Sequence, residues 1–265
     1  MIARGDWTNL RKITLLHEYV AGLPPEKIVF VIDLYDVVWL DCGRDLVEAF
    51  RSFGAELVFG AEFHPYPLSN GTLRRLPGGY PVLSGRGRVA EHVRVRHGGD
   101  GRLLAYRYLN SGCIAGYAGA LLRATGRLTA AGFDNEYVLR TPLARTAKER
   151  RAALVGQDDQ VAWHAYAIRH PEEVALDYGA ALFLNVLGFD LTDFWLDAAG
   201  KIRGTSFEED LCFAHGNGAS NVARYLFDAQ RLRVQPSHCF QEAQEVPGGT
   251  VRFQLVCAAA PARAE

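Results

Sequence analysis

The sequence predicts an α/β domain in which parallel strands alternate with helices. A run of β-branched and aromatic residues, Ile28–Ile32, has the length of a buried strand, and a second short apolar run covers 56–61. Between them, residues 44–53 carry apolar side chains at helical spacing. A strand, a helix and a strand at this separation form a βαβ unit, so we expect parallel pairing within one sheet.

The other elements follow from periodicity and from turn residues. We expect further helices over 10–20, 118–126, 158–169 (amphipathic) and 220–229. We expect further strands over 93–96, 113–117, 174–176, 181–184 and 211–214. Residues 64–101 are rich in Pro, Gly and Arg, which indicates a long irregular region, and 125–151 is polar and Arg-rich like an insertion.

Composition excludes several classes of protein. The 265 residues include 29 Lys and Arg against 30 Asp and Glu, a formal charge of −1, and 49% are hydrophobic. An apolar fraction this high excludes wholesale disorder, and the near-zero charge argues against a nucleic-acid partner held by bulk electrostatics. No apolar run approaches the roughly 18 to 20 residues of a membrane span, and the polar residues 1–9 do not form a signal peptide.

Five cysteines are scattered along the chain without a C-x-x-C pair. This pattern favours free or buried thiols in a reducing compartment, with a single disulfide left open.

The first chemical feature is Asp33-Leu34-Tyr35-Asp36, which follows the strand 28–32. Ligands bind at the carboxyl ends of strands in open α/β sheets, and two carboxylates leaving a strand in a turn can hold one divalent cation. The alternative is that Asp33 or Asp36 only caps the following turn.

Three further features lie at predicted element ends. Asp158 and Asp159 open a helix, where capping is the simpler explanation. His215 precedes Gly216-Asn217-Gly218 after an apolar strand; a histidine there can complete a metal site, although a lone histidine is more often structural. The turn 109–112 presents the amide of Asn110.

Together these carboxylates and the distant histidine suggest a nucleotide-sugar transferase. A bound cation would bridge the diphosphate and neutralise the leaving group, while other carboxylates orient the acceptor hydroxyl or stabilise the sugar. A phosphatase of the haloacid-dehalogenase type is less well matched, because its chemistry needs Asp-x-Asp and two residues separate Asp33 from Asp36.

Seven motifs in order carry a family resemblance: VIDLYDVVW, LVFGAE, a Pro-aromatic-Pro segment, YRYLNSG, GQDDQ, LDYGAALFLNVLG and AHGNG. From about Lys12 to Tyr225 the chain resembles the glycosyltransferase domain of the procollagen lysyl hydroxylases. The resemblance implies a GT-A-like fold, a Rossmann-type mixed sheet with flanking helices, over 1–231, with 232–265 as an unassigned tail. It also implies Mn2+, a UDP-sugar donor and transfer of a hexose to a hydroxyl acceptor, such as a hydroxylysine-linked or other glycan.

The resemblance also implies roles for individual residues. The implied metal ligands are Asp33, Asp36 and His215. The implied nucleotide and diphosphate contacts are Tyr35, Gly216 and Asn217. The residues implied near the transferred sugar are Asp158, Asp159 and Asn110. Tyr66 stands where the family has an acceptor-side Trp.

The chain departs from the family in two places. Ala219-Ser220-Asn221 replaces the usual Pro-Thr-Lys, so the phosphate-gripping Lys is absent and we expect weaker donor binding. The family has a strand, a helix and a strand before the segment matching 10–20, so we expect a truncated domain. The resemblance implies the secretory pathway, whereas a true start at Met1 would imply the cytoplasm. The alternatives are a non-catalytic transferase-like binding domain and a metal-dependent phosphohydrolase.

Overall fold

The computed structural model describes residues 9–33, 36–40, 42–66, 83–85, 95–97, 102–104, 107–130, 158–189, 193–196, 202–204, 207, 210–217, 239–246 and 250–257. Within these residues, no helix combines the length and the apolar character needed to cross a lipid bilayer.

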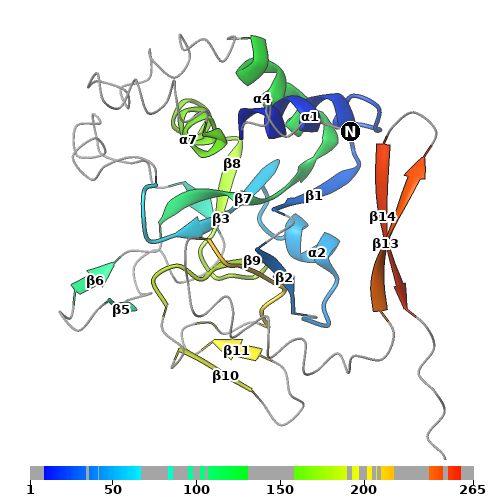
Figure 1. Cartoon of the computed structure of the whole chain (residues 1–265). Helices are drawn as coiled ribbons and strands as arrows, with labels where there is room; N and C mark the ends of the chain where they lie inside the picture. The colour runs from blue at the N-terminus through cyan, green and yellow to red at the C-terminus, as the bar shows by residue number, and fades with distance from the viewer. Residues whose placement is uncertain are drawn as a thin grey trace, which may run out of the picture.

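One mixed sheet organises the fold (Figure 1). The strands are β1 Ile28–Ile32, β2 Val37–Trp39, β3 Leu57–Glu62, β4 Ser84–Gly85, β7 Tyr108–Tyr117, β8 Val174–Asp177, β9 Phe183–Asn185 and β12 Phe213–His215. They lie in the order β1-β7-β3-β9-β12-β2, with β8 beside β3 and β4 beside β8. β3 pairs in parallel with β8 and β9, and β9 with β12, whereas β7 and β2 run antiparallel to their neighbours.

Helices cover both faces of this sheet. They are α1 Leu10–Val20, α2 Leu46–Arg51, α4 Ala118–Ala130 and α7 Asp159–Arg169. α1, α4 and α7 lie together over one face, and α2 lies on the other (Figure 1). Side chains of β3 alternate between the two layers, since Leu57 and Phe59 join the core with α1 and α4, while Val58 packs with Phe50 of α2. The predicted α/β class with a mixed sheet and flanking helices is confirmed.

Strand β7 separates the two strands of the expected βαβ unit. β1 and β3 both pair antiparallel with β7, so they run in the same direction but are not neighbours. The expected parallel pairing is therefore found elsewhere in the sheet. The expectation of a fully buried β1 is also wrong: Ile32 is 39% exposed, because within the described residues β1 pairs on one side only.

Two predicted helices are confirmed with small corrections. α1 begins and ends at the predicted residues. α7 begins after Asp158, whose carboxylate accepts a hydrogen bond from the backbone N–H of Gln160 at 2.9 Å, so the capping explanation holds for this residue. α7 is not amphipathic, since residues 159–167 are all buried against α1, α4 and β7.

A disulfide joins Cys42 to Cys212. The expectation of free thiols is wrong for these two residues, because 170 positions separate them in sequence and only the pairing of β2 with β12 brings them together. Cys113 is buried and free.

Three two-stranded ribbons complete the described structure. They are β5 Val95–His97 with β6 Arg102–Leu104, β10 Phe194–Leu196 with β11 Ile202–Gly204, and β13 Cys239–Val246 with β14 Thr250–Cys257. The last ribbon lies in the stretch that the sequence leaves unassigned. The predicted helix 220–229 and most of the predicted insertion 125–151 lie outside the described residues.

Candidate active site

Strand direction brings the candidate residues to one edge of the sheet. β1, β3, β9 and β12 run in the same direction, and their carboxyl ends carry Asp33, Glu62, Asn185 and His215. β7 and β2 run the opposite way and start at this edge, which adds Asn110 and Asp36. This is the edge at which open α/β sheets bind ligands.

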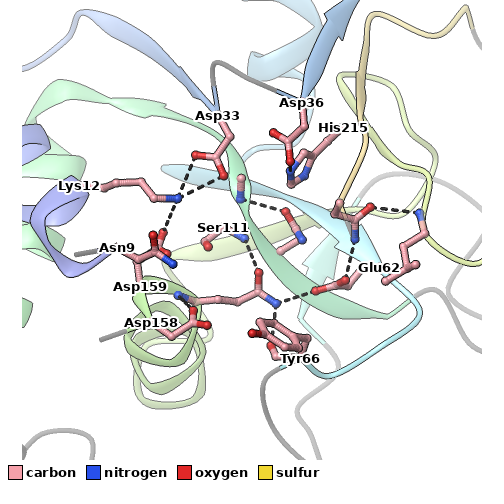
Figure 2. Close-up of a pocket in the computed structure, with 15 residues that line it drawn as sticks. Asn9, Lys12, Asp33, Asp36, Glu62, Tyr66, Ser111, Asp158, Asp159 and His215 are labelled. Atoms are coloured by element: carbon pink, nitrogen blue, oxygen red, sulfur yellow. Dashed lines mark hydrogen bonds and ion pairs between the residues drawn. The ribbon is translucent and has the colours of Figure 1, made fainter. Parts of the chain in front are cut away.

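A pocket of about 410 Å³ opens there (Figure 2). Most of the residues that line it are charged or polar. The lining carboxylates are Asp33, Asp36, Glu62, Asp158 and Asp159. The lining amide side chains are Asn9, Asn110, Gln160 and Asn217. Such a surface suits a ligand rich in hydroxyl groups or one held through a cation.

Two of these carboxylates and a further lining residue, His215, form a candidate metal centre. One ligand atom each from Asp33, Asp36 and His215 lies within 4.8 Å of the others. The Nε2 atom of His215 is 3.4 Å from a carboxylate oxygen of Asp36, and a hydrogen bond from His215 lowers the pKa of Asp36. Two carboxylates and an imidazole form a suitable donor set for a divalent cation such as Mn2+.

The backbone holds these ligands firmly. The N–H of Asp33 donates to the carbonyl of Gly112 at 2.8 Å, and the N–H of Gly216 donates to the carbonyl of Asp36 at 2.6 Å. A Cβ on Gly112 would lie 2.1 Å from Cε1 of His215, so only glycine leaves room for the imidazole.

Lys12 adds a positive charge to the pocket, and the sequence analysis did not predict its place there. Its Nζ lies 2.9 Å from one oxygen of Asp33 and 3.5 Å from Asp159 (Figure 2). Burial opposes the charge of Lys12, but attraction to Asp159 and the hydrogen bond to Asp33 outweigh it and raise its pKa. A lysine in the first turn of a helix opposes the helix dipole, which is the one sequence signal for a special role.

Asp158 and Asp159 line the side of the pocket formed by α7. Asp159 is 4% exposed, and burial raises its pKa to about 6. Burial also raises the pKa of Asp158. The pair predicted from the sequence therefore lies at the pocket. Asp158 caps α7 and also lines the pocket.

Glu62 is a second residue that the sequence analysis missed. It is 1% exposed, and its oxygens accept hydrogen bonds from Gln160 at 2.6 Å and from Asn217 at 2.9 Å. Burial raises its pKa to about 8 despite these amide donors, so Glu62 is mostly protonated at pH 7. The sequence contained a pattern that could have identified Glu62, because Glu62 ends an apolar strand just as Asp33 follows one.

Asn110 lies in a strand and not in the expected turn. Residues 109–112 belong to β7, beside a register shift between Phe59 and Gly60 of β3. The side-chain oxygen of Asn110 accepts a hydrogen bond from the N–H of Gly112 at 2.9 Å. The correction has a physical reason, since an irregular ladder lets a polar stretch of a buried strand face a pocket.

The remaining predicted residues are distributed around this centre. Asn217 reaches the pocket, and its side-chain oxygen accepts a hydrogen bond from the N–H of Leu187 at 3.0 Å. Gly216 contacts Asp36 through its backbone. Tyr66 is 61% exposed and lies in the lining. Tyr35 lies outside the described residues.

Comparison with known proteins finds distant relatives. No known family profile matches the chain. The chain is 24% identical over 199 residues to procollagen-lysine,2-oxoglutarate 5-dioxygenase 1 of Mus musculus, which covers 74% of this chain and 21% of that protein. It is 25% identical over 197 residues to the Bos taurus protein of the same name, covering 74% of this chain and 21% of that protein. It is 30% identical over 109 residues to the procollagen-lysine,2-oxoglutarate 5-dioxygenase of Drosophila melanogaster, covering 40% of this chain and 12% of that protein.

The chain thus spans about a fifth of the length of the mouse and bovine relatives. The names of these relatives describe enzymes. The identities of 24 to 30% make the chain a distant relative of them.

Proposed function

We propose that this chain is a metal-dependent glycosyltransferase domain that transfers a hexose from a UDP-sugar to a hydroxyl acceptor. The observation that carries the proposal is the convergence of Asp33, Asp36 and His215 within 4.8 Å at the ligand-binding edge of the sheet. The resemblance of the seven ordered motifs to a glycosyltransferase domain supplies the reaction class.

In this proposal, Asp33, Asp36 and His215 hold Mn2+. A cation held by these residues would supply positive charge against the charge that develops on the leaving UDP. Lys12 lies at the same carboxylate of Asp33 and adds a further positive charge for the phosphates. It offers a substitute for the phosphate-binding lysine that the chain lacks near Asn221.

Gly216 and Asn217 then lie beside the diphosphate, and Tyr35 contacts the nucleoside. Hydrogen bonds favour the first two assignments, because the backbone N–H of Gly216 donates to the carbonyl of Asp36 and the side-chain amide of Asn217 donates to the buried Glu62. Tyr35 rests on the sequence motif alone.

The carboxylates of the pocket divide into two protonation states. With a pKa of about 6, Asp159 is mainly ionised at pH 7 and can accept a hydrogen bond from a sugar or acceptor hydroxyl. Glu62, with a pKa of about 8, is mainly neutral at pH 7 and anchors the amides of Gln160 and Asn217. Asp158 and Asn110 provide further hydrogen-bonding groups at the pocket.

The acceptor side is assigned to Tyr66. Its exposure at the rim of the pocket suits stacking against a sugar ring, and its backbone carbonyl accepts a hydrogen bond from Gln160 at 2.6 Å. A hydroxylysine-linked sugar is the first acceptor to test, because the relatives are named for procollagen lysine.

The experiment measures UDP release from UDP-glucose and UDP-galactose, with and without Mn2+, and transfer to a galactosyl-hydroxylysine peptide. We expect Mn2+-dependent turnover that falls about 100-fold or more in Asp36→Ala, since even outer-shell changes at metal sites cost 10- to 100-fold. The exposed Glu18→Ala is the matched control and keeps full activity.

Two results would overturn the proposal. Full activity in Asp36→Ala would show that the candidate metal site takes no part in the reaction. Thermal stabilisation by UDP plus Mn2+ without turnover on any of these substrates would instead identify a non-catalytic binding domain.

A further inference from the structure

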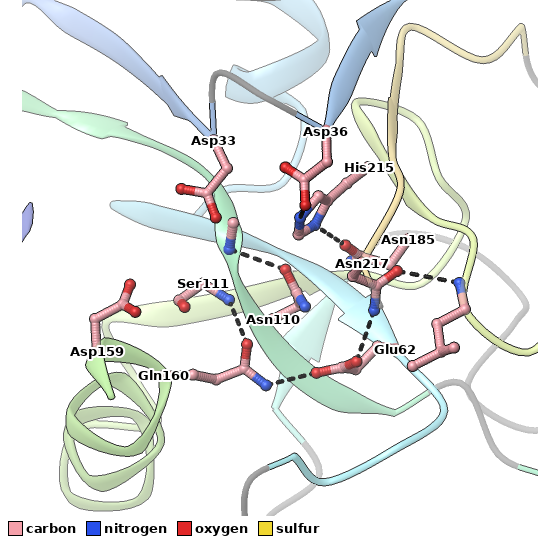
Figure 3. A network of polar contacts seen from close by, with 12 residues as sticks. Asp33, Asp36, Glu62, Asn110, Ser111, Asp159, Gln160, Asn185, His215 and Asn217 are labelled. Atoms are coloured by element: carbon pink, nitrogen blue, oxygen red, sulfur yellow. Dashed lines mark hydrogen bonds and ion pairs between the residues drawn. The ribbon is translucent and has the colours of Figure 1, made fainter. Parts of the chain in front are cut away.

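Asn185 is buried directly behind His215 and has no role in the proposed function. It is the last residue of β9 and is 0% exposed. Its side-chain oxygen lies 2.7 Å from Nδ1 of His215, on the side of the ring away from Asp36 (Figure 3). Asn185 therefore does not reach the pocket, and it contacts a pocket residue from within the core.

The orientation of the Asn185 amide follows from its other contact. The side-chain nitrogen of Asn185 donates to the backbone carbonyl of Ala61 at 2.7 Å. A carbonyl oxygen can only accept, so the NH2 group must face Ala61 and the Oδ1 atom must face His215. The flipped amide would place two oxygen acceptors against each other.

This orientation assigns the imidazole proton. Because Oδ1 of Asn185 is an acceptor only, Nδ1 of His215 must carry hydrogen. Nε2 faces Asp36 at 3.4 Å and can donate to it only when the ring carries both protons. When the ring is neutral its one proton is on Nδ1, and Nε2 has a free lone pair. Nε2 is thus prepared as the metal-binding atom before any cation arrives.

The fold makes space for this pair at a neighbouring strand. A Cβ on Gly60 would lie 2.5 Å from the side-chain nitrogen of Asn185, so a larger residue would displace the amide. Gly60 is next to Ala61, which supplies the anchoring carbonyl, and together with the clearance at Gly112 it keeps both partners in place.

We propose that Asn185 is a positioning residue for His215: held by the carbonyl of Ala61, its amide keeps the imidazole proton on Nδ1 and so presents Nε2 to a divalent cation. This inference rests on the metal-binding role in the proposed function, but its tests need neither a sugar nor turnover.

The first test reads the tautomer directly. Long-range 1H–15N correlation spectra of metal-free protein with 15N-labelled histidine are recorded at about pH 9, where an ordinary imidazole is neutral. The His215 signal is identified by its loss in His215→Gln. We expect a single Nδ1–H tautomer in the wild type, and an Nε2–H tautomer there would overturn the proposal without any variant of Asn185 having to fold.

The second test measures Mn2+ affinity by electron paramagnetic resonance. Asn185→Leu keeps the approximate volume but removes the acceptor, so the ring can hold its proton on either nitrogen, and we expect affinity to fall about 10- to 100-fold. Asn185→Asp restores an acceptor at Nδ1 if its other oxygen, which faces the carbonyl of Ala61, carries a proton, and in that form it should recover most of that loss. Leu184→Val, in the same strand and in the hydrophobic core, is the control for a general loss of packing and should keep wild-type affinity.

Unchanged Mn2+ affinity in Asn185→Leu would overturn the positioning role. An equal loss in Leu184→Val would overturn it too, because the effect would then come from packing. If both tests succeed and no sugar is transferred, the proposed reaction fails while the role of Asn185 stands.

Discussion

The disulfide between Cys42 and Cys212 closes the pairing of β2 with β12 at the end opposite Asp36 and His215. Val37 of β2 faces His215 across this pair, and the N–H of Leu40 donates to the carbonyl of Cys212 at 2.7 Å. Each strand has only three residues, so the covalent link stabilises a short pairing that sets two candidate metal ligands side by side.

Replacing both cysteines, Cys42→Ala with Cys212→Ala, should therefore affect stability and metal binding together. The link closes a loop of 170 residues, so we expect the free energy of unfolding to fall by about 3 to 5 kcal/mol, measured by urea denaturation. Mn2+ affinity should fall about 10-fold, the size of an outer-shell disturbance. Cys113→Ala, which removes a buried thiol without a cross-link, should leave Mn2+ affinity unchanged. Wild-type stability in the double variant would contradict this account.

Lys12→Met should have opposite effects on two ligands. The ammonium of Lys12 competes with a cation for Asp33, so Mn2+ alone should bind more tightly to the variant, by about threefold to tenfold. UDP in the presence of Mn2+ should bind about 10- to 150-fold more weakly, because a charge-assisted contact of roughly 1.5 to 3 kcal/mol is lost. Isothermal titration calorimetry measures both, and the exposed Lys27→Met serves as control. If both affinities stay at their wild-type values, Lys12 plays no part at the site.

Glu62 should make stability depend on pH. Burial raises its pKa from 4.5 to about 8, so the folded state binds its proton more tightly than the unfolded state. The free energy of unfolding should then fall as pH rises from about 4.5 to 8. Between pH 7 and 8 the fall should be about 1 kcal/mol, in a range where Asp159, with a pKa of about 6, has already ionised.

Urea denaturation at pH 7 and pH 8 checks this dependence. The fall should be absent in Glu62→Gln, which cannot ionise, and unchanged in the exposed Glu26→Gln. An equal fall in Glu62→Gln and in the wild type would assign the pH dependence to another group.

Gly112→Ala should remove the metal site through a steric effect. The new Cβ would lie 2.1 Å from Cε1 of His215, so the imidazole must leave its place. We expect Mn2+ affinity to fall about 100-fold or more and the free energy of unfolding to fall by about 1 to 3 kcal/mol. In Gly22→Ala the new Cβ lies 3.8 Å from the nearest atom, a backbone oxygen, and both quantities should stay unchanged. Normal Mn2+ binding by Gly112→Ala would show that His215 is not a ligand.

Local pattern was sufficient for much of the fold and of the site. α1, α7 and the strands near 28–32, 57–62 and 174–176 follow from apolar periodicity and from capping residues, which act between near neighbours in sequence. Asp33 and His215 could be selected because each stands at the end of an apolar stretch, and Asp36 because it lies three residues after Asp33. The structure brings the three together.

Other features depend on contacts between distant residues and could not be derived from local pattern. The insertion of β7 between β1 and β3 is a matter of long-range pairing, and so is the Cys42–Cys212 link. Lys12 and Glu62 gain their altered pKa values from burial and from neighbours up to 155 positions away, as in the contact between Glu62 and Asn217.

The sequence by itself determined the α/β class, most element positions and the three candidate metal ligands, because these depend on periodicity and on where apolar runs stop. Only the tertiary structure decided which atom each candidate metal ligand presents to the pocket. Asn185 was an unassigned residue in a motif until the carbonyl of Ala61 fixed its amide and, through it, the proton of His215. The direction of a hydrogen bond depends on the groups that surround it in the folded protein. Here those groups come from three strands that are distant in sequence and meet only in the sheet.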